Sequence, residues 1–210
     1  MGLLMLSGAY DVDPNRIFVT GLSAGGAMAS SLLSGYPDLF AAGAIVAGLP
    51  HGSAANVYDA IEAMARGRER TPQQWGEIVR LASPHRGPWP RLAIWHGTDD
   101  TVVHPANAEA GALQWIDLHE VTLEPTRDVT SGDHRLRVWR DRSDQAVIEM
   151  HTINGMGHGV ALAADGEDGC GQADPFHFDV GISSSVRILE FFRITAEGGK
   201  ADDAVGPTAR

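Results

Sequence analysis

A serine between small residues stands close to the start of the chain, in residues 21–25 (GLSAG). The pentapeptide fits the pattern G-x-S-x-G, in which a sharp strand-to-helix turn exposes a serine hydroxyl for nucleophilic attack. The flanks agree, because residues 17–20 predict a short buried strand and residues 24–34 predict a helix of small residues. We expect glycine to be needed on both sides of the serine, where backbone packs against backbone. Ser23 is therefore a candidate nucleophile, and a glycine-rich loop without chemistry is the alternative.

A serine hydroxyl is a weak nucleophile at neutral pH, so it needs a general base, and that base needs an acid to orient it. Two carboxylates, Asp99 and Asp100, follow a strand predicted at residues 91–95. A carboxylate in such a turn often serves only in an Asx-turn or as an N-cap, and we expect one of the two to do so. Either can therefore be the orienting acid.

His158 is the candidate base. It lies in the segment 155–159 (GMGHG), after a strand predicted at residues 146–153. Glycines around a histidine let a loop present the imidazole ring without steric hindrance. The rival His96 precedes the acid along the chain and so breaks the order serine, acid, histidine. No H-E-x-x-H or similar spacing occurs, so we predict no metal site. The other histidines are interpreted as surface, cap or strand residues: His51, His85, His104, His119, His134, His151 and His177.

Strands and helices must alternate to position these side chains. Further helices are predicted at residues 56–66, 71–82, 105–119 and 181–193, and further strands at 41–47 and 135–140. The polar residues 141–145 between two alternating segments suggest a hairpin. This alternation predicts an α/β fold with a mainly parallel sheet. We interpret residues 1–195 as one domain and residues 196–210 as a disordered tail.

Composition narrows the class of partner. The chain has 210 residues, enough for one domain with a sizeable core, and a formal net charge of −11. That charge disfavours nucleic acid and anionic membranes as partners. No apolar run approaches the roughly 20 residues that cross a bilayer. Cys170 is the only cysteine, so no intrachain disulfide is expected. The acidic segment 165–174 does not match a calcium-binding loop and is interpreted as solvated.

Taken together, these segments resemble the poly(3-hydroxybutyrate) depolymerase-like esterases, an α/β-hydrolase family related to the feruloyl and acetylxylan esterases. The resemblance covers about residues 11–194, and its motifs are residues 13–28, 47–52, 95–103, 155–159 and 174–185. By this resemblance Ser23 is the nucleophile, Asp100 the acid and His158 the general base. The family pattern H-G-x-x-D-x-x-V selects Asp100 over Asp99, and the backbone N–H of Ala24 is one oxyanion donor. No cofactor is implied.

The same resemblance implies a serine carboxylic ester hydrolase that acts on polyhydroxyalkanoate-type or related esters. The alternatives are a feruloyl or acetylxylan-type esterase, or a truncated α/β-hydrolase that is inactive or needs a partner chain. Family members carry strands before the nucleophile, with a loop that supplies the second oxyanion donor. Only 16 residues precede the first predicted strand here. We therefore expect that strand to be an exposed apolar edge, which a homo-oligomer would cover.

Three further expectations accompany this resemblance. It suggests a secreted or periplasmic protein, although the start of the chain lacks the basic region of a signal peptide. A family cysteine that matches Cys170 often has a bonding partner, whereas the corresponding segment here carries Ser183 and Ser184. Three tryptophans are expected in the core rather than in a substrate groove: Trp75, Trp89 and Trp95.

Overall fold

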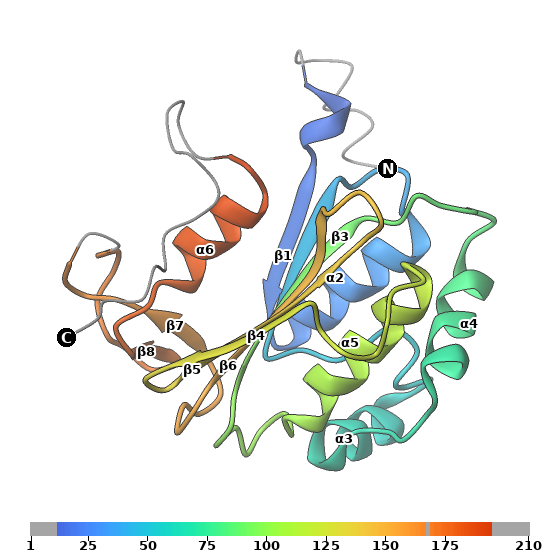
Figure 1. Ribbon diagram of the computed structural model, residues 1–210. Coiled ribbons are helices and arrows are strands. Elements are labelled where there is room, and N and C mark those ends of the chain that lie inside the picture. Colours follow the sequence, from blue (N-terminus) through green and yellow to red (C-terminus); the bar gives the residue numbers. More distant parts are fainter. Residues whose placement is uncertain (1–11, 167–168, 195–210) are drawn as a thin grey trace.

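The computed structural model describes residues 12–166 and 169–194 and contains a twisted central sheet with helices on both faces (Figure 1). The sheet has six strands in the order β1-β2-β3-β6-β5-β4. The strands β1, β2, β3 and β6 are parallel, and β5 and β4 are antiparallel additions beside β6. The strands are β1 (Phe18–Leu22), β2 (Ala42–Val46), β3 (Arg91–Gly97), β4 (Arg127–Ser131), β5 (His134–Arg140) and β6 (Ala146–Ile153). The predicted hairpin between β5 and β6 is confirmed.

Each central strand sends alternate side chains to the two faces of the sheet, as the two-residue period of a strand requires. In β3, Leu92 and Ile94 join the core beneath the helices α2 (Ala24–Gly35), α4 (Pro72–Ala82) and α5 (Ala106–Leu118). Ala93 and Trp95 face the other way, toward α6 (Ser184–Phe191). Figure 1 shows α6 across the sheet from α2, α4 and α5. Both faces are therefore covered, which is typical of mainly parallel sheets.

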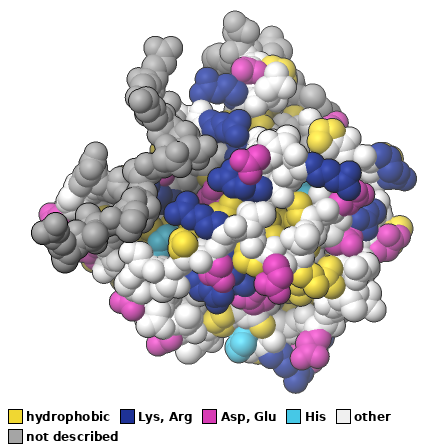
Figure 2. Space-filling model, viewed as in Figure 1, with side chains coloured by type: hydrophobic (Ala, Val, Ile, Leu, Met, Phe, Trp, Pro, Cys, Tyr) yellow, Lys and Arg dark blue, Asp and Glu magenta, His cyan; other side chains and the backbone are white. Residues whose placement is uncertain are grey.

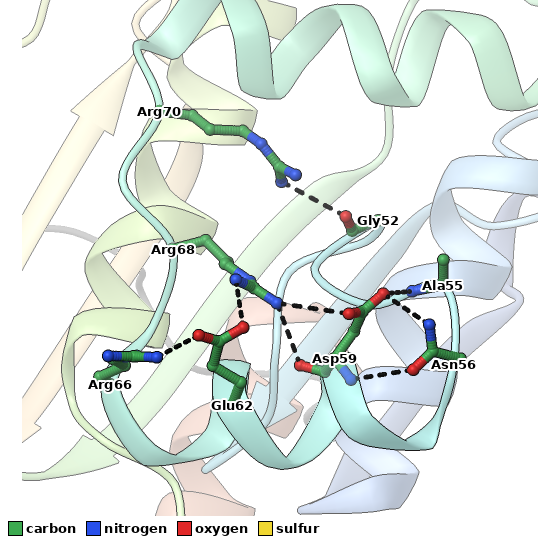
Figure 3. A network of polar contacts seen from close by, with 8 residues as sticks. All are labelled: Gly52, Ala55, Asn56, Asp59, Glu62, Arg66, Arg68 and Arg70. Atoms are coloured by element: carbon green, nitrogen blue, oxygen red, sulfur yellow. Dashed lines mark hydrogen bonds and ion pairs between the residues drawn. The ribbon is translucent and has the colours of Figure 1, made fainter.

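The remaining helix, α3 (Val57–Arg66), is fixed at both ends by polar contacts (Figure 3). The Asn56 side chain accepts from the Asp59 backbone N–H at 3.0 Å and caps the first turn. Near the other end, Glu62 pairs with Arg66 and with Arg68. Hydrogen bonds from Arg66 and then Arg68 lower the pKa of Glu62. A separate hydrogen bond ties α3 to the segment just before α5, because His104 N–H donates to the Met64 carbonyl at 2.8 Å.

Four elements were not expected from the sequence. The strand β4 has all five residues exposed, so it has no apolar alternation to reveal it. A 3₁₀ turn precedes β1 (Pro14–Arg16), and two three-residue strands pair in parallel beside the main sheet, β7 (Val160–Leu162) and β8 (His177–Asp179). Segments this short carry too little pattern to be recognised. The last helix begins at Ser184 rather than 181, because Gly181 has φ 71° and Ser183 forms the cap.

The strand β1 forms one edge of the sheet, because among the described residues it pairs only with β2. The Ile17 carbonyl and the Ser23 N–H both bond to the segment of β2. Since hydrogen-bonding direction alternates along a strand, Thr20 directs its N–H and C=O to the open edge. The predicted tail, residues 196–210, lies outside the described residues. None of the helices in the described part of the chain is long and apolar enough to cross a membrane.

Candidate active site

Ser23 occupies the turn between β1 and α2 with a backbone conformation that serine rarely adopts. Its φ is 57° and its ψ is −118°, a strained region for a residue with a side chain. Two backbone hydrogen bonds hold the turn, from Ser23 N–H to the Val46 carbonyl at 2.9 Å and from Ala27 N–H to the Ser23 carbonyl at 3.0 Å. The strain is thus imposed by β2 and α2 together, as expected for a nucleophile displayed on a sharp turn.

The two glycines of the motif differ in what they do, which corrects the expectation that both are needed. A Cβ on Gly21 would lie 2.3 Å from the backbone carbon and oxygen of Gly25, so the turn admits no side chain there. A Cβ on Gly25 would meet nothing within 4 Å. The second close approach belongs instead to Gly26, whose Cβ would lie 3.1 Å from the Val46 carbonyl oxygen. Backbone packing therefore requires Gly21 and constrains Gly26, but leaves Gly25 free.

The loop after β3 brings Asp100 to His158. Asp100 is buried, and its Oδ2 lies 2.8 Å from His158 Nδ1. Its other oxygen accepts from the backbone N–H groups of Val102 and Val103 at 2.9 and 2.8 Å, forming an Asx-turn. Asp99 is exposed and accepts only from Thr98 Oγ1 among the described contacts. The expectation that one of the two aspartates makes an Asx-turn is confirmed, and that residue is Asp100, which also contacts His158.

The loops after β3 and β6 are locked together. A Cβ on Gly97 would lie 2.0 Å from the Met156 carbonyl oxygen, so only glycine permits this approach. Asp99 N–H donates to that same carbonyl at 3.0 Å, and Thr98 Oγ1 accepts from Gly155 N–H at 2.8 Å. The spacing of Asp100 and His158 is therefore set by backbone contacts rather than by the two side chains alone.

Ser23, Asp100 and His158 follow β1, β3 and β6, which are parallel, so all three lie at the carboxyl edge of the sheet. Ligand sites of open α/β sheets are found at this edge. Within the described part of the chain, Ser23 Oγ makes no hydrogen bond, including to His158. Catalytic hydrogen bonds are often long before substrate binds. Ala24 is the first residue of α2, and the first N–H groups of a helix have no partner within it.

Two residues at the site were missed by sequence reasoning. His96 is buried and its Nε2 lies 3.2 Å from Asp100 Oδ2, the oxygen that also contacts His158. Its position four residues before Asp100 was the available signal, but chain order had set it aside. Phe176 is 56% exposed, has φ 66°, and its ring meets the His158 ring edge-on with centroids 6.3 Å apart. The sequence carried no signal for an exposed aromatic ring here.

Other candidate groups lie elsewhere. Trp75 and Trp95 are buried, and Trp89 packs against the core beside Trp115, as predicted. A cavity of about 830 Å³ between the β4–β6 face and α6 is lined by His134, His151 and other residues, but by no candidate triad member. Burial lowers the pKa of His134 to about 4. In residues 12–166 and 169–194, no three His, Cys, Asp or Glu side chains are placed to hold a metal.

A mainly parallel sheet, an elbow serine and a later histidine–aspartate pair at one sheet edge define an α/β-hydrolase. A solved acetyl xylan esterase from Aspergillus awamori has the same fold, with a TM-score of 0.73 and 22% identity over 92% of this chain and 65% of its own. The family model described as esterase PHB depolymerase matches residues 5–140. The chain belongs to this esterase family.

Two curated relatives illustrate the range of the family. Poly(3-hydroxyalkanoate) depolymerase C of Paucimonas lemoignei is 36% identical over 187 residues, which is 88% of this chain and 45% of the relative. An acetylxylan esterase of Coprinopsis cinerea is 37% identical over 156 residues, 72% of this chain and 41% of the relative. The chain thus spans less than half the length of these two curated relatives.

Proposed function

We propose that this chain is a serine carboxylic ester hydrolase with Ser23 as nucleophile, His158 as general base and Asp100 as orienting acid. The observation that carries the proposal is the 2.8 Å contact between His158 Nδ1 and Asp100 Oδ2, at the same sheet edge as the strained Ser23. A carboxylate can only accept, so His158 carries its proton on Nδ1 and keeps Nε2 free to receive one. We propose residues 1–195 as the single domain that carries this site.

The reaction then proceeds through an acyl-enzyme. His158 Nε2 takes the proton of Ser23 Oγ as that oxygen attacks the ester carbonyl carbon. The tetrahedral oxyanion is stabilised by the Ala24 N–H at the start of α2, aided by the helix dipole. The bond to the alcohol oxygen breaks, and the alcohol leaves with the proton from His158. Water then attacks the acyl group, gives its proton to His158, and the acid is released as Ser23 recovers its hydrogen.

We propose polyhydroxyalkanoate-type esters as the substrate class, with acetylxylan-type or feruloyl esters as the alternative. Both classes have a relative in the family. The exposed ring of Phe176 contacts His158 edge-on and offers an apolar surface for an acyl chain. We expect the ratio kcat/KM for hydroxybutyrate oligomers to exceed that for acetylated xylan and methyl ferulate. A preference for either of the latter would overturn this assignment while leaving the chemistry unchanged.

Replacing Ser23 by alanine tests the chemistry itself. We expect Ser23→Ala to lower kcat for a short-chain p-nitrophenyl ester by about 10⁴-fold or more, with an unchanged circular dichroism spectrum. The matched control is Ser185→Ala, because Ser185 is exposed on α6, and it should keep wild-type turnover. Undiminished hydrolysis by Ser23→Ala would sink the proposal.

We also propose that a second copy of this chain pairs along β1. This proposal corresponds to the alternative of a hydrolase that needs a partner chain. The residues Phe18–Leu22 contain no charge and no proline, although exposed edges are usually protected by such residues. The 3₁₀ turn Pro14–Arg16 lies at the amino end of β1, away from Ser23.

Nucleic acid is disfavoured as a partner by the charge of −11. On the face in Figure 2 several basic side chains gather in the upper and middle part, with acidic side chains between and below them.

A further inference from the structure

A small cavity lies between the end of β3 and α5. Its volume is about 10 Å³, close to the smallest space that holds one water molecule. Most of its lining is apolar or backbone and comes from the end of β2, β3 and α5. Two polar side chains also line it, His96 from β3 and Asn107 from α5. Both residues are 1% exposed, so bulk solvent does not reach them.

The proton positions on His96 follow from its neighbours. Its Nε2 lies 2.7 Å from the Val103 carbonyl oxygen, and a carbonyl oxygen can only accept, so Nε2 carries a hydrogen. Burial lowers the pKa of His96, which favours the neutral ring. In the neutral ring Nδ1 is then a bare acceptor. This Nδ1 is buried and has no donor among the described residues.

The same reasoning orients the amide of Asn107. Its Nδ2 lies 2.9 Å from the Ala63 carbonyl oxygen and 3.0 Å from the His104 carbonyl oxygen. Two carbonyls can be satisfied only by the NH₂ group, so the amide cannot be flipped. Asn107 Oδ1 is thereby left as the second buried acceptor without a donor in the described part of the chain. The two residues that line this cavity with polar side chains therefore each carry a buried acceptor without a protein donor. A single molecule that donates two hydrogen bonds would satisfy both acceptors.

We infer that one buried water molecule occupies this cavity, donates to His96 Nδ1 and Asn107 Oδ1, and so makes His96 a positioning residue for Asp100. Water is the smallest neutral molecule that donates two hydrogen bonds, and leaving either acceptor unpaired is costly. The water holds His96 as the Nε2–H tautomer. That hydrogen is shared between the Val103 carbonyl and Asp100 Oδ2, the oxygen that also receives His158.

The water is tested first in the wild-type chain. Nitrogen-15 NMR of the histidine rings should show His96 protonated at Nε2 and unprotonated at Nδ1, and water should give a cross-relaxation signal to the Ile94 methyl groups that line the cavity. A protonated Nδ1, or no water signal at Ile94, would overturn the inference.

A cavity-filling substitution gives an independent test. The melting temperature should fall if the cavity holds water and rise if the cavity is dry. Gly111 lines the cavity, and a Cβ there would meet only Ile94 Cδ1, at 3.5 Å. If the cavity holds the water, Gly111→Ala expels it and should lower the melting temperature by about 3 °C or more, as two acceptors lose their donor. If the cavity is dry, the better helix former should raise it by about 2–4 °C.

Gly35→Ala is the matched control for helix propensity. It places a methyl group in open space at the end of α2 and should not lower the melting temperature. If Gly111→Ala melts at or above the wild-type temperature, the water is excluded.

The role of His96 in positioning Asp100 rests on the proposed function, in which Asp100 is the orienting acid. Two His96 variants test this role. Glutamine can place an amide N–H where His96 Nε2 stands, whereas asparagine is too short to reach the Val103 carbonyl. We expect His96→Asn to lower kcat at least 10-fold with KM within about twofold, and His96→Gln to recover most of that loss. Equal losses in both variants would contradict the positioning role. If instead Ser23→Ala retains turnover, the triad fails, while the NMR and melting results still decide the water.

Discussion

Asp100 uses its two carboxylate oxygens for different purposes. Oδ1 accepts two backbone N–H groups and shapes the loop, whereas Oδ2 receives His158 Nδ1 and lies 3.2 Å from His96 Nε2. A buried carboxylate is costly unless its lone pairs are filled, and here four donors meet it. The side chain is therefore both a structural part of the loop and the group that sets the tautomer of the proposed base.

Replacing Asp100 by asparagine should separate these two roles. The amide can keep the Asx-turn through its oxygen, but its NH₂ then faces His158 Nδ1 and favours the tautomer with hydrogen on Nε2. We expect kcat to fall about 10⁴-fold with the fold retained. Asp99→Asn is the control, since Asp99 is exposed and does not contact His158. Steady-state kinetics on a p-nitrophenyl ester measures both, and similar losses in the two variants would contradict the assignment.

His119 offers a test of pH-dependent stability away from the site. Its Nε2 lies 3.1 Å from the Pro90 carbonyl, and burial lowers its pKa to about 4, below the usual 6.5. The unfolded chain therefore takes up this proton first, so the stability that neutral His119 supports is complete above pH 6.5 and is lost as pH falls toward 4.

Glutamine at position 119 keeps an N–H donor for the Pro90 carbonyl but does not titrate. Relative to wild type, His119→Gln should gain about 1–3 kcal/mol of unfolding free energy between pH 7.5 and pH 4.5. Urea unfolding at a series of pH values gives the difference, and the value above pH 7 serves as the internal reference. A difference that stays constant with pH would show that His119 does not titrate in this way.

At the scale of elements, the elbow between β1 and α2 depends on one glycine of its motif far more than on the other. Gly21 lies against the Gly25 backbone, whereas Gly25 itself has open space where a Cβ would stand. We expect Gly21→Ala to cost about 3 kcal/mol or more of unfolding free energy, because no flexible side chain can yield. Gly25→Ala should be neutral or stabilising by up to about 1 kcal/mol.

Chemical denaturation of the two variants checks this prediction. Gly25→Ala is the matched control, with the same substitution four residues away in the same turn. Equal destabilisation by the two substitutions would mean that the turn responds to any added methyl group rather than to the contact between Gly21 and Gly25.

At the scale of the whole molecule, the uncharged edge of β1 predicts a dimer. Thr20 is the middle residue of β1, so a two-fold axis beside it would pair the edges of two copies antiparallel. Thr20→Pro removes the N–H that points outward and spares the bonds to β2. We expect wild type to sediment as a dimer at micromolar concentration and Thr20→Pro to shift toward monomer. Thr20→Val, which keeps the N–H, should behave as wild type, and a monomeric wild type would refute the pairing.

Helices and strands could be predicted from the sequence where contacts between neighbouring residues determine them, and could not where contacts with distant segments do. The elements α4 and β6 were recognised because caps and apolar periodicity are properties of neighbouring residues, and α2 was recognised from the serine motif and the small residues that follow it. The strand β4 was missed since its five residues are all exposed. Pairing of β4 with β5 arises from backbone hydrogen bonds to a neighbouring strand, for which no residue type is required.

For the site, the sequence alone determined the residue types and their order: an elbow serine, an aspartate after a strand and a histidine in a glycine-rich loop. These follow from local chemistry, because turns and loops of this kind require particular small residues. Only the tertiary structure decided that Asp100 both shapes its loop and meets His158, that His96 stands behind it, and that Gly25 is dispensable for packing. Such facts depend on which atoms of distant segments come within a few ångströms, and no spacing along a chain encodes that distance.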